Sequence, residues 1–543
     1  MTTVTTVTSV MSAQQVQSIS WAPLAPVLVL VGGLVLVLMA DLMLPSAVRR
    51  TVLPAVSALA CLCAAGSAAW LGGMPARGTF CSPASARQVR CSYVFDETAA
   101  FVTVLLCLAA TAVLVLALAQ LRADVAGATP AGEYCLVLLA ATIGALIVTG
   151  SRDLITLLVG LETLTVPMYA AVAFRRGSTA GPEAALTFLI VSVTSTALML
   201  LGIGFLYGLT GSMHLDAIAG ALTAGGGVSD VALSGVAVVL LLAGLAFKVG
   251  AVPFHVWAPS TYQGAPIPVA AYLSSVSKAA GIAGLIVVLP AISAGSPAAA
   301  TWIAILAAVS MTVGNLVAMR QQHLVRLLAW SGIAQTGYLL VGLAVLSGRS
   351  DQALSGAGAT LAYLAVYVLM TVGAFACIAA IEAATRRAPA GVNSADGPSI
   401  ESVRGLASDH PRIAAALALF LIGLAGLPPA LLGLFGKVVV VRAAFTGDAG
   451  WLGILVALNT VLAFVYYLRV AAALFAKTAE RSAGPAGVLP GVQPGGPAES
   501  LPGQSVSVAT GALVAVLAAV ALVAGFWPDL IIGAAPLLAP FAG

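Results

Sequence analysis

The feature that most limits the fold of this chain is the scarcity of charge along very long apolar runs. Of its 543 residues, 61% are hydrophobic and 8% are charged, whereas soluble domains carry about 25% charged residues. So few charges could not cover a water-soluble surface, and the mean hydropathy of +1.08 indicates many membrane spans. The composition therefore excludes a cytosolic enzyme, a nucleic-acid-binding protein and a disordered chain.

Apolar stretches bounded by charges, Pro or Gly predict an all-α polytopic membrane protein with about fourteen transmembrane helices. The expected spans are 22–44, 51–72, 96–119, 134–150, 153–174, 183–209, 231–252, 268–290, 299–319, 323–347, 355–384, 411–445, 450–476 and 507–528. The first twenty residues contain no Lys or Arg, so they lack the positive region of a cleavable signal peptide. We therefore expect the first span to be retained.

The distribution of basic residues predicts the orientation of the spans. With the N-terminus outside, the odd-to-even connections are cytoplasmic and hold 14 basic residues: Arg49, Arg50, Arg122, Arg175, Arg176, Arg320, Arg326, Arg386, Arg387, Arg404, Arg412, Arg469, Lys477 and Arg481. The opposite side holds 6: Arg77, Arg87, Arg90, Arg152, Arg349 and Arg442. Because positive charge favours the cytoplasmic side, both termini are expected outside.

Cysteine placement suggests one cross-link and no metal site. The outer loop 73–95 carries Cys81 and Cys91, and a disulfide there is feasible in an oxidising compartment. Such a bond would contribute about 3 kcal/mol, and two free thiols are the alternative. The other cysteines lie within predicted helices, where a buried Cys behaves as a small hydrophobe. We therefore expect no bound metal.

Four charged residues lie inside apolar segments: Glu162, Lys248, Lys278 and Lys437. Together they would cost on the order of 10 kcal/mol to insert in a bilayer. Glu162 is ten residues from the start of its helix at Arg152, and Lys278 is ten residues past Pro268. That separation is about 15 Å along a helix, which places both side chains near mid-membrane.

Helix-breaking residues accompany the other two lysines. Lys437 follows Pro411 by 26 residues, about 39 Å of unbroken helix, which is too far for the hydrocarbon core. Pro428 and Pro429 must break this helix, so Lys437 is expected in the interior beside an unwound stretch. Lys248 similarly precedes Pro253. Broken helices with polar residues are typical of ion pathways in inverted-repeat transporters.

These groups favour proton transfer, and each also has a purely structural alternative. Glu162 and Lys248 form a candidate switch, because a nearby opposite charge holds both groups charged and separation favours proton release. Released protons could reach Lys278 through water and the hydroxyls of Ser274, Ser275, Ser277 and Thr312. Alternatively, the lysines snorkel towards the interface and Glu162 is a protonated structural donor. His255 either relays protons or caps a turn.

Three stretches resemble the proton-translocating antiporter-like subunits of respiratory complex I, and within that group the subunits N of bacterial NADH-quinone oxidoreductase. They are GLAFKVGAVPFHVWAPSTYQGAPIPVAAYLSSVSKAAG (244–281), GNLVAMRQQHLVRLLAWSGIAQTGYLLVG (314–342) and GLAGLPPALLGLFGK (423–437). The resemblance covers roughly 96–530. It implies two inverted five-helix repeats, helices 4–8 and 9–13, with helices 7 and 12 broken.

The resemblance also divides the chain. It implies N-terminal helices 1–3 in 1–119, a first repeat in 120–290, a second in 291–477 and a last helix with its tail in 507–543, while the Pro/Gly-rich composition of 478–506 predicts a flexible linker. It implies a proton relay of Glu162 paired with Lys248, a central Lys278 and an outward-facing Lys437. Such a subunit holds no cofactor itself; FMN, iron–sulfur clusters and quinone belong to partner subunits.

The chain departs from the family pattern at three positions. Thr187 stands where a lysine is usual, Gln335 stands where a histidine is common, and an acidic residue is often found near Ser260. The predicted function is a subunit that moves protons outward in the bacterial inner membrane, beside other antiporter-like and quinone-proximal subunits. The alternatives are a subunit of a multisubunit cation/proton antiporter or membrane hydrogenase, and a structural subunit that conducts nothing.

Overall fold

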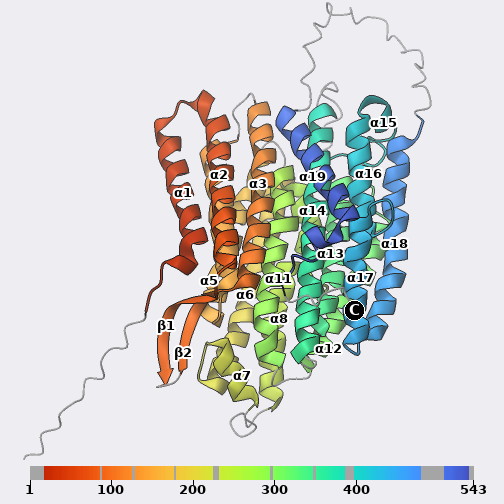
Figure 1. Cartoon of the computed structure of the whole chain (residues 1–543). Helices are drawn as coiled ribbons and strands as arrows, with labels where there is room; N and C mark the ends of the chain where they lie inside the picture. Colours follow the sequence, from red (N-terminus) through yellow and green to blue (C-terminus); the bar gives the residue numbers. More distant parts are fainter. Residues whose placement is uncertain are drawn as a thin grey trace, which may run out of the picture.

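The computed structural model describes residues 18–85, 88–124, 129–175, 179–223, 231–293, 298–345, 350–385, 397–477 and 507–536. These residues form a bundle of long helices with a short β-hairpin at one end (Figure 1). Six basic residues used to predict orientation lie outside the described residues: Arg87, Arg176, Arg349, Arg386, Arg387 and Arg481. The predicted linker 478–506 also lies outside them.

The elements follow one another along the chain in three groups. The first comprises η1 (Ala22–Leu24), α1 (Ala25–Met43), α2 (Ser46–Gly72), β1 (Arg77–Ser85), β2 (Gln88–Phe95) and α3 (Glu97–Ala123). The second comprises α4 (Ala131–Gly150), α5 (Leu154–Ala173), α6 (Ala180–Thr210), α7 (Leu215–Thr223), α8 (Val231–Val249), α9 (Trp257–Gly264), α10 (Ile267–Tyr272), the π-helical turn η2 (Leu273–Ser277) and α11 (Lys278–Ser293).

The third group completes the bundle. It comprises α12 (Ala298–Ala318), α13 (Leu324–Ala344), α14 (Ser350–Thr385), α15 (Leu406–Asp409), α16 (Pro411–Ala425), α17 (Leu431–Thr446), α18 (Gly450–Phe475), α19 (Val508–Phe526) and η3 (Pro528–Leu530). Within the described part of the chain, thirteen helices are long and apolar enough to cross a membrane. The chain is thus a multi-pass membrane protein.

The expected span 411–445 differs from the others because it is divided into α16 and α17, each too short to cross alone. α16 ends where Gly426 adopts a left-handed backbone with φ of 78°, and Pro428 and Pro429 cannot continue a helix. The predicted break is therefore present. A second break separates α8 from α9, where Gly250 has φ of 72° and Pro253 follows.

Connections alternate between the two ends of the bundle. At one end, here called the hairpin end, the backbone N–H of Arg152 donates to Ser92 O at 2.8 Å and Leu154 N–H donates to Met213 O at 3.0 Å. At the opposite end, Leu324 N–H donates to Pro398 O at 3.0 Å. Figure 1 shows β1, β2 and α7 together at the hairpin end and α15 at the other.

The segment 73–95, expected from the sequence to be an outer loop, contains the antiparallel strands β1 and β2, which the sequence analysis did not predict. Helix α7 is likewise an element that the hydropathy pattern did not indicate. Both are short and lie outside the apolar spans, where hydrophobic periodicity carries little information. Arg90 of β2 forms an ion pair with Asp216 of α7 at 3.1 Å, so the two elements are joined.

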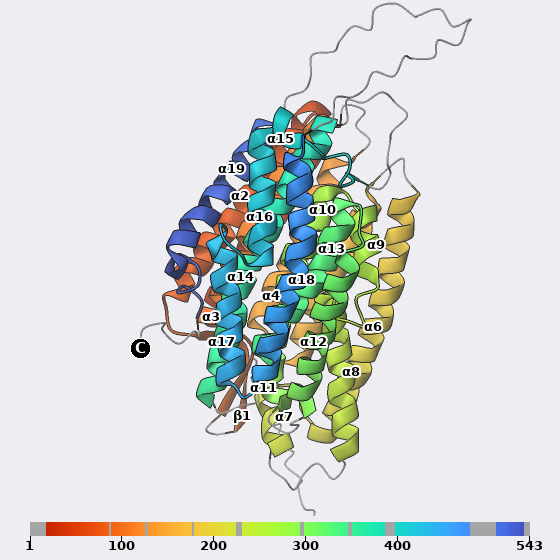
Figure 2. The same ribbon diagram turned by 90° about the vertical axis from the view of Figure 1, so that its right-hand side faces the viewer.

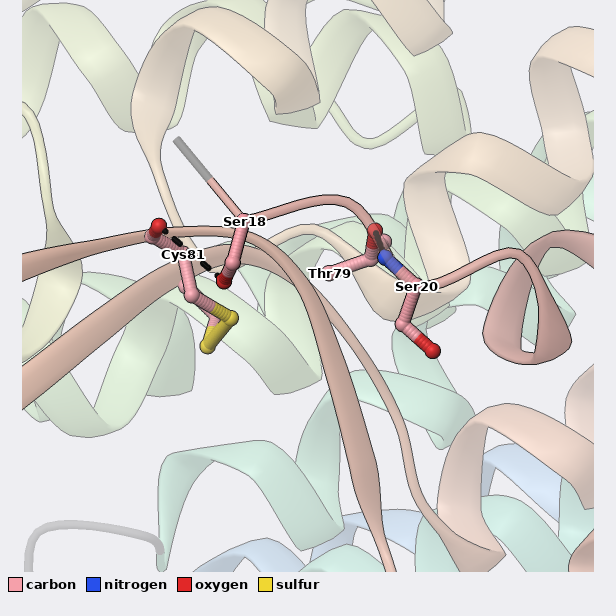
Figure 3. The surroundings of a disulfide bond; sticks show 5 residues. Ser18, Ser20, Thr79 and Cys81 are labelled. Carbon is pink, nitrogen blue, oxygen red and sulfur yellow. Dashed lines mark hydrogen bonds between the residues drawn. A yellow bond between two sulfur atoms is a disulfide. The ribbon is translucent and has the colours of Figure 1, made fainter. Parts of the chain in front are cut away.

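A disulfide between Cys81 and Cys91 joins β1 to β2. The segment before α1 is held beside this disulfide, because the N–H of Ser18 donates to Cys81 O at 2.8 Å. Figure 3 shows the Ser18 hydroxyl donating to the same oxygen at 3.3 Å and the N–H of Ser20 donating to the Thr79 hydroxyl at 3.0 Å. The hairpin is thereby connected to the start of the first span.

Burial is deepest along the middle of the bundle. α13 and α14 are almost completely enclosed, and so is the span formed by α10, η2 and α11. In contrast, α1, α6 and α19 expose much of their apolar surface, as a helix on the lipid-facing side does. Figure 2, turned by 90° from Figure 1, shows α13 and α14 behind α16 and α18. Any charged group on the central helices is thus removed from lipid and from water.

The crossing of α16 and α17 provides a test of this packing. A Cβ atom on Gly433 would lie 1.8 Å from the Gly423 carbonyl oxygen, so Gly433→Ala must force the two half-helices apart. We expect the overpacking to destabilise the folded subunit by about 1–3 kcal/mol, measured as a lower melting temperature of the intact assembly. Gly208→Ala is the matched control because nothing lies within 4 Å of that position, and equal melting temperatures for both variants would contradict the close crossing.

Candidate functional site

Glu162 and Lys248 form an ion pair between α5 and α8. The Lys248 Nζ atom lies 3.0 Å from Glu162 Oε1 and donates to the Thr165 hydroxyl at 2.7 Å. The Thr196 hydroxyl of α6 donates to the same Glu162 oxygen at 2.9 Å. The Lys248 side chain is 3% exposed and that of Glu162 is 29% exposed, so the carboxylate is the accessible member of the pair.

The end of α8 places Lys248 beside a backbone carbonyl that a side chain from another helix satisfies. Because α8 stops at Val249, its last carbonyl groups have no partner within the helix. The hydroxyl of Thr336, on α13, donates to Val249 O at 2.7 Å. Lys248 also lies in the last helical turn, where the helix dipole stabilises a cation.

Lys278 lies at the start of α11, directly after the π-helical turn η2. Its Nζ atom donates to Gly332 O at 2.6 Å and to the Thr336 hydroxyl at 2.9 Å. Thr336 therefore touches both Lys278 and the broken end of α8. Lys278 is 3% exposed, and its two acceptors are neutral, so this ammonium is held without a carboxylate partner.

Gln335 connects the central lysine region to the break between α16 and α17. Its Nε2 atom donates to Leu424 O at 3.0 Å, and its Oε1 atom accepts a hydrogen bond from the hydroxyl of Tyr363. Gln335 and Thr336 are neighbours on α13 and both are fully buried. Gln335 thus joins α13 to α14 and to the end of α16 through a neutral amide.

Lys437 lies at the second break and is also buried. Its Nζ atom donates to Ala425 O, the last carbonyl of α16, at 2.7 Å and to the Thr460 hydroxyl of α18 at 3.2 Å. The ammonium is 4.4 Å from the centre of the Tyr338 ring, which is within the range of a cation–π interaction. Gly426 leaves room for this lysine, since a Cβ there would lie 2.7 Å from Lys437 Cδ.

Three of the four hydroxyls expected to relay protons donate to carbonyls of their own helices, as the lysine-bound hydroxyls of Thr165 and Thr460 also do, so their part in a relay stays a prediction. Ser274 and Ser275 both donate to Ala271 O, at 3.0 and 2.6 Å. Thr312 donates to Ala308 O at 2.8 Å. His255 lies between α8 and α9 with its ring 5.2 Å from that of Trp330. Its assignment as a relay or a cap stays a prediction.

The residues that do contact the buried charges were missed in the sequence. Thr165 could have been found, because it is three residues after Glu162 and faces the same side of the helix. Thr336 and Thr460 lie far along the chain from the lysines that they contact, and Thr or Ser occurs throughout these apolar helices. No local signal distinguishes them. Across the described ranges, no group of three or more His, Cys, Asp or Glu side chains could hold a metal ion.

The four charged groups thus form a discontinuous polar line through the middle of the bundle. It runs from Glu162 and Lys248 through Thr336 to Lys278, and through Gln335 to the break beside Lys437. Two properties follow from the geometry. The groups can bind and release protons, and the flanking residues supply oxygen acceptors rather than a substrate-sized clamp.

Comparisons with known proteins agree with this arrangement. Residues 151–463 match the family described as NADH:quinone oxidoreductase/Mrp antiporter, transmembrane. The chain is 47% identical to NADH-quinone oxidoreductase subunit N of Salinispora tropica over 458 residues, covering 83% of this chain and 84% of that protein. It is similar in structure to a chain of respiratory complex I from Thermus thermophilus, with a TM-score of 0.71 and 28% identity, over 94% of this chain and 99% of that chain.

A chain of the Mrp complex from a Dietzia species shares the fold, with a TM-score of 0.74 at 21% identity, over 95% of this chain and 96% of that chain. The family match spans both helix breaks, Glu162 and the three buried lysines. The chain therefore belongs to the family of subunits N of NADH-quinone oxidoreductase, the antiporter-like membrane subunits of complex I.

Proposed function

We propose that this subunit conducts protons across the membrane along Glu162, Lys248, Lys278 and Lys437, driven by quinone reduction in a partner subunit. The observation that carries the proposal is the set of three buried ammonium groups, each hydrogen-bonded to a threonine hydroxyl. A permanently buried cation is costly. Proton exchange with neighbouring oxygens would explain why the chain keeps lysines at these buried positions.

The first step concerns the ion pair. While Glu162 Oε1 lies 3.0 Å from Lys248 Nζ, the carboxylate favours the charged ammonium. When the pair separates, Lys248 is a desolvated cation without its counter-ion and gives up a proton. After Lys278 has passed its own proton on towards Lys437, the proton from Lys248 reaches the resulting neutral amine by way of water near Thr336, whose hydroxyl contacts both Val249 O and Lys278 Nζ.

The second step crosses from the first repeat to the second. Gln335 cannot titrate, so a proton leaving Lys278 must travel on water past its amide towards Lys437. The Gln335 amide would orient that water, since it already bonds to Tyr363 and to Leu424 O. His255 would be an additional relay only if water connects it to the lysines.

We assign the segments from the family resemblance and the orientation from the distribution of basic residues. Residues 1–119 would be the N-terminal helices, 120–290 and 291–477 the two inverted repeats, 478–506 a linker, and 507–543 the last helix and tail. The subunit would lie in the bacterial inner membrane with both termini outside. The disulfide between Cys81 and Cys91 supports an outer, oxidising location for the hairpin end.

The partners would be the other antiporter-like and quinone-proximal membrane subunits, and the subunits that hold FMN, iron–sulfur clusters and quinone. A cation/proton antiporter or membrane hydrogenase subunit would share the fold. Identification of the subunits that co-purify in mild detergent distinguishes these assemblies. Co-purification with FMN-containing and quinone-binding subunits supports the proposal, and their absence contradicts it.

Removal of the central lysine tests the relay. We expect Lys278→Ala to slow proton transfer through this subunit by about 10²-fold or more, because a positioned proton carrier is lost. The measurement is the proton-to-electron ratio and turnover of the intact complex in vesicles. Lys477→Ala is the control, since Lys477 is exposed at a helix end. Unchanged ratio and turnover in Lys278→Ala would overturn the assignment, and a non-conducting structural subunit would then explain the chain.

Thr336 is a positioning residue in this scheme, and its hydroxyl is testable. Thr336→Val leaves the Val249 carbonyl without a donor and removes one of two acceptors of Lys278, at a cost of about 1–3 kcal/mol. We expect a lower proton-to-electron ratio in Thr336→Val, with restoration in Thr336→Ser. Equal ratios in the Val and Ser variants, with both complexes assembled, would show that the hydroxyl has no role in transfer.

The orientation is tested by thiol labelling of intact cells. After reduction, a membrane-impermeant maleimide should label Cys81 or Cys91 from outside, and the Cys81→Ser/Cys91→Ser double variant should lose that label. Labelling of the same thiols only in inside-out vesicles would reverse the orientation.

A further inference from the structure

An apolar groove of about 950 Å³ lies on the surface between α14, α16 and α19. α16 contributes Ala415 and Ala418 to its lining, and α19 contributes Gly511, Ala515 and Ala518. These small side chains leave the groove open where larger ones would fill it. Figure 2 shows α16 and α19 side by side. The groove lies outside the line of buried charges and has no part in the proposed relay.

The dimensions of the groove match one leaflet of a bilayer. Its α19 lining runs from Gly511 to Leu522, a segment that rises about 17 Å along the helix. Half of the hydrocarbon core is about 15 Å thick. The groove begins at Asp409 and His410, beside α15 at one end of the bundle, and reaches Pro429 at the break between α16 and α17. It therefore extends from the membrane surface to mid-membrane.

Charge is confined to the mouth of the groove. Asp409, His410 and Arg412 line that end, whereas the remaining lining is apolar or backbone. Among the described residues, none of these three side chains takes part in an ion pair. The mouth thus offers one carboxylate beside one guanidinium and one imidazole. A partner with both a negative and a positive group would complement it better than a purely anionic one.

We propose that this groove binds a phospholipid with an ethanolamine headgroup. Its phosphate would contact Arg412 and His410, where the guanidinium is suited to a phosphate, and its ammonium would contact Asp409. One acyl chain would lie along Ala415, Ala518 and Leu522 and end near Pro429. The lipid would cover the exposed outer side of the α16–α17 break, whose inner side holds Lys437.

The test uses the intact complex, washed in detergent and then supplied with dioleoyl phosphatidylethanolamine, phosphatidylglycerol or phosphatidylcholine in micelles. Ala518→Phe fills the groove, and Val516→Phe is the control because Val516 is exposed on α19 but does not line the groove. Retained phospholipid is counted by mass spectrometry. We expect one fewer phosphatidylethanolamine per complex in Ala518→Phe and no loss in Val516→Phe.

The headgroup variants keep the proposal testable if Ala518→Phe fails to assemble. Arg412→Gln should weaken rebinding of phosphatidylethanolamine about tenfold, the effect of losing one charge-assisted hydrogen bond. Asp409→Asn should remove the preference for ethanolamine over glycerol headgroups. Unchanged retention in Ala518→Phe, or equal binding of all three lipids to the unaltered complex, would overturn the proposal. So would efficient cross-linking of Ala515→Cys to a partner subunit, because a protein segment would then occupy the groove.

Discussion

The structure depends on the way in which two broken helices satisfy their last carbonyl groups inside the membrane. A helix that stops within the hydrocarbon region leaves acceptors that water cannot reach. Thr336 donates to Val249 O at the end of α8, Gln335 donates to Leu424 O, and Lys437 donates to Ala425 O at the end of α16. The breaks and the buried polar groups therefore require each other: neither would be stable without the other.

This reciprocity also explains how lysines without carboxylate partners are tolerated. Lys437 faces the negative end of the α16 dipole, and Lys278 bonds to the Gly332 carbonyl and the Thr336 hydroxyl. Neutral oxygens hold an ammonium less firmly than a carboxylate does. Lys248 is the exception, because Glu162 and Thr165 both bind it. The strongest electrostatic stabilisation of a lysine thus lies at one end of the polar line, at Lys248. Lys278 and Lys437, further along the line, are stabilised more weakly by neutral oxygens.

Much of this arrangement could be predicted from the sequence because lipid imposes simple rules. Long apolar runs identified the spans, and the mismatch between a 26-residue separation and the bilayer thickness predicted the break before Lys437. The hairpin and α7 could not be predicted. They are short elements outside the apolar spans, so neither the length of apolar runs nor the bilayer thickness constrains them. Thr336 and Thr460 were missed because their contacts join distant helices. Ser274 and Ser275 donate to the backbone of their own helix, and their part in a relay stays a prediction.

The central claim is that cations held at helix breaks transfer protons, rather than only stabilising the fold. The most direct test is the number of protons moved per NADH oxidised by the intact complex in sealed vesicles when Lys437 is replaced by Gln. A glutamine can still donate to the Ala425 carbonyl but cannot carry a proton. The account predicts an assembled complex with a lower ratio in Lys437→Gln and a normal ratio in Lys477→Gln. A normal ratio in an assembled Lys437→Gln complex would contradict it.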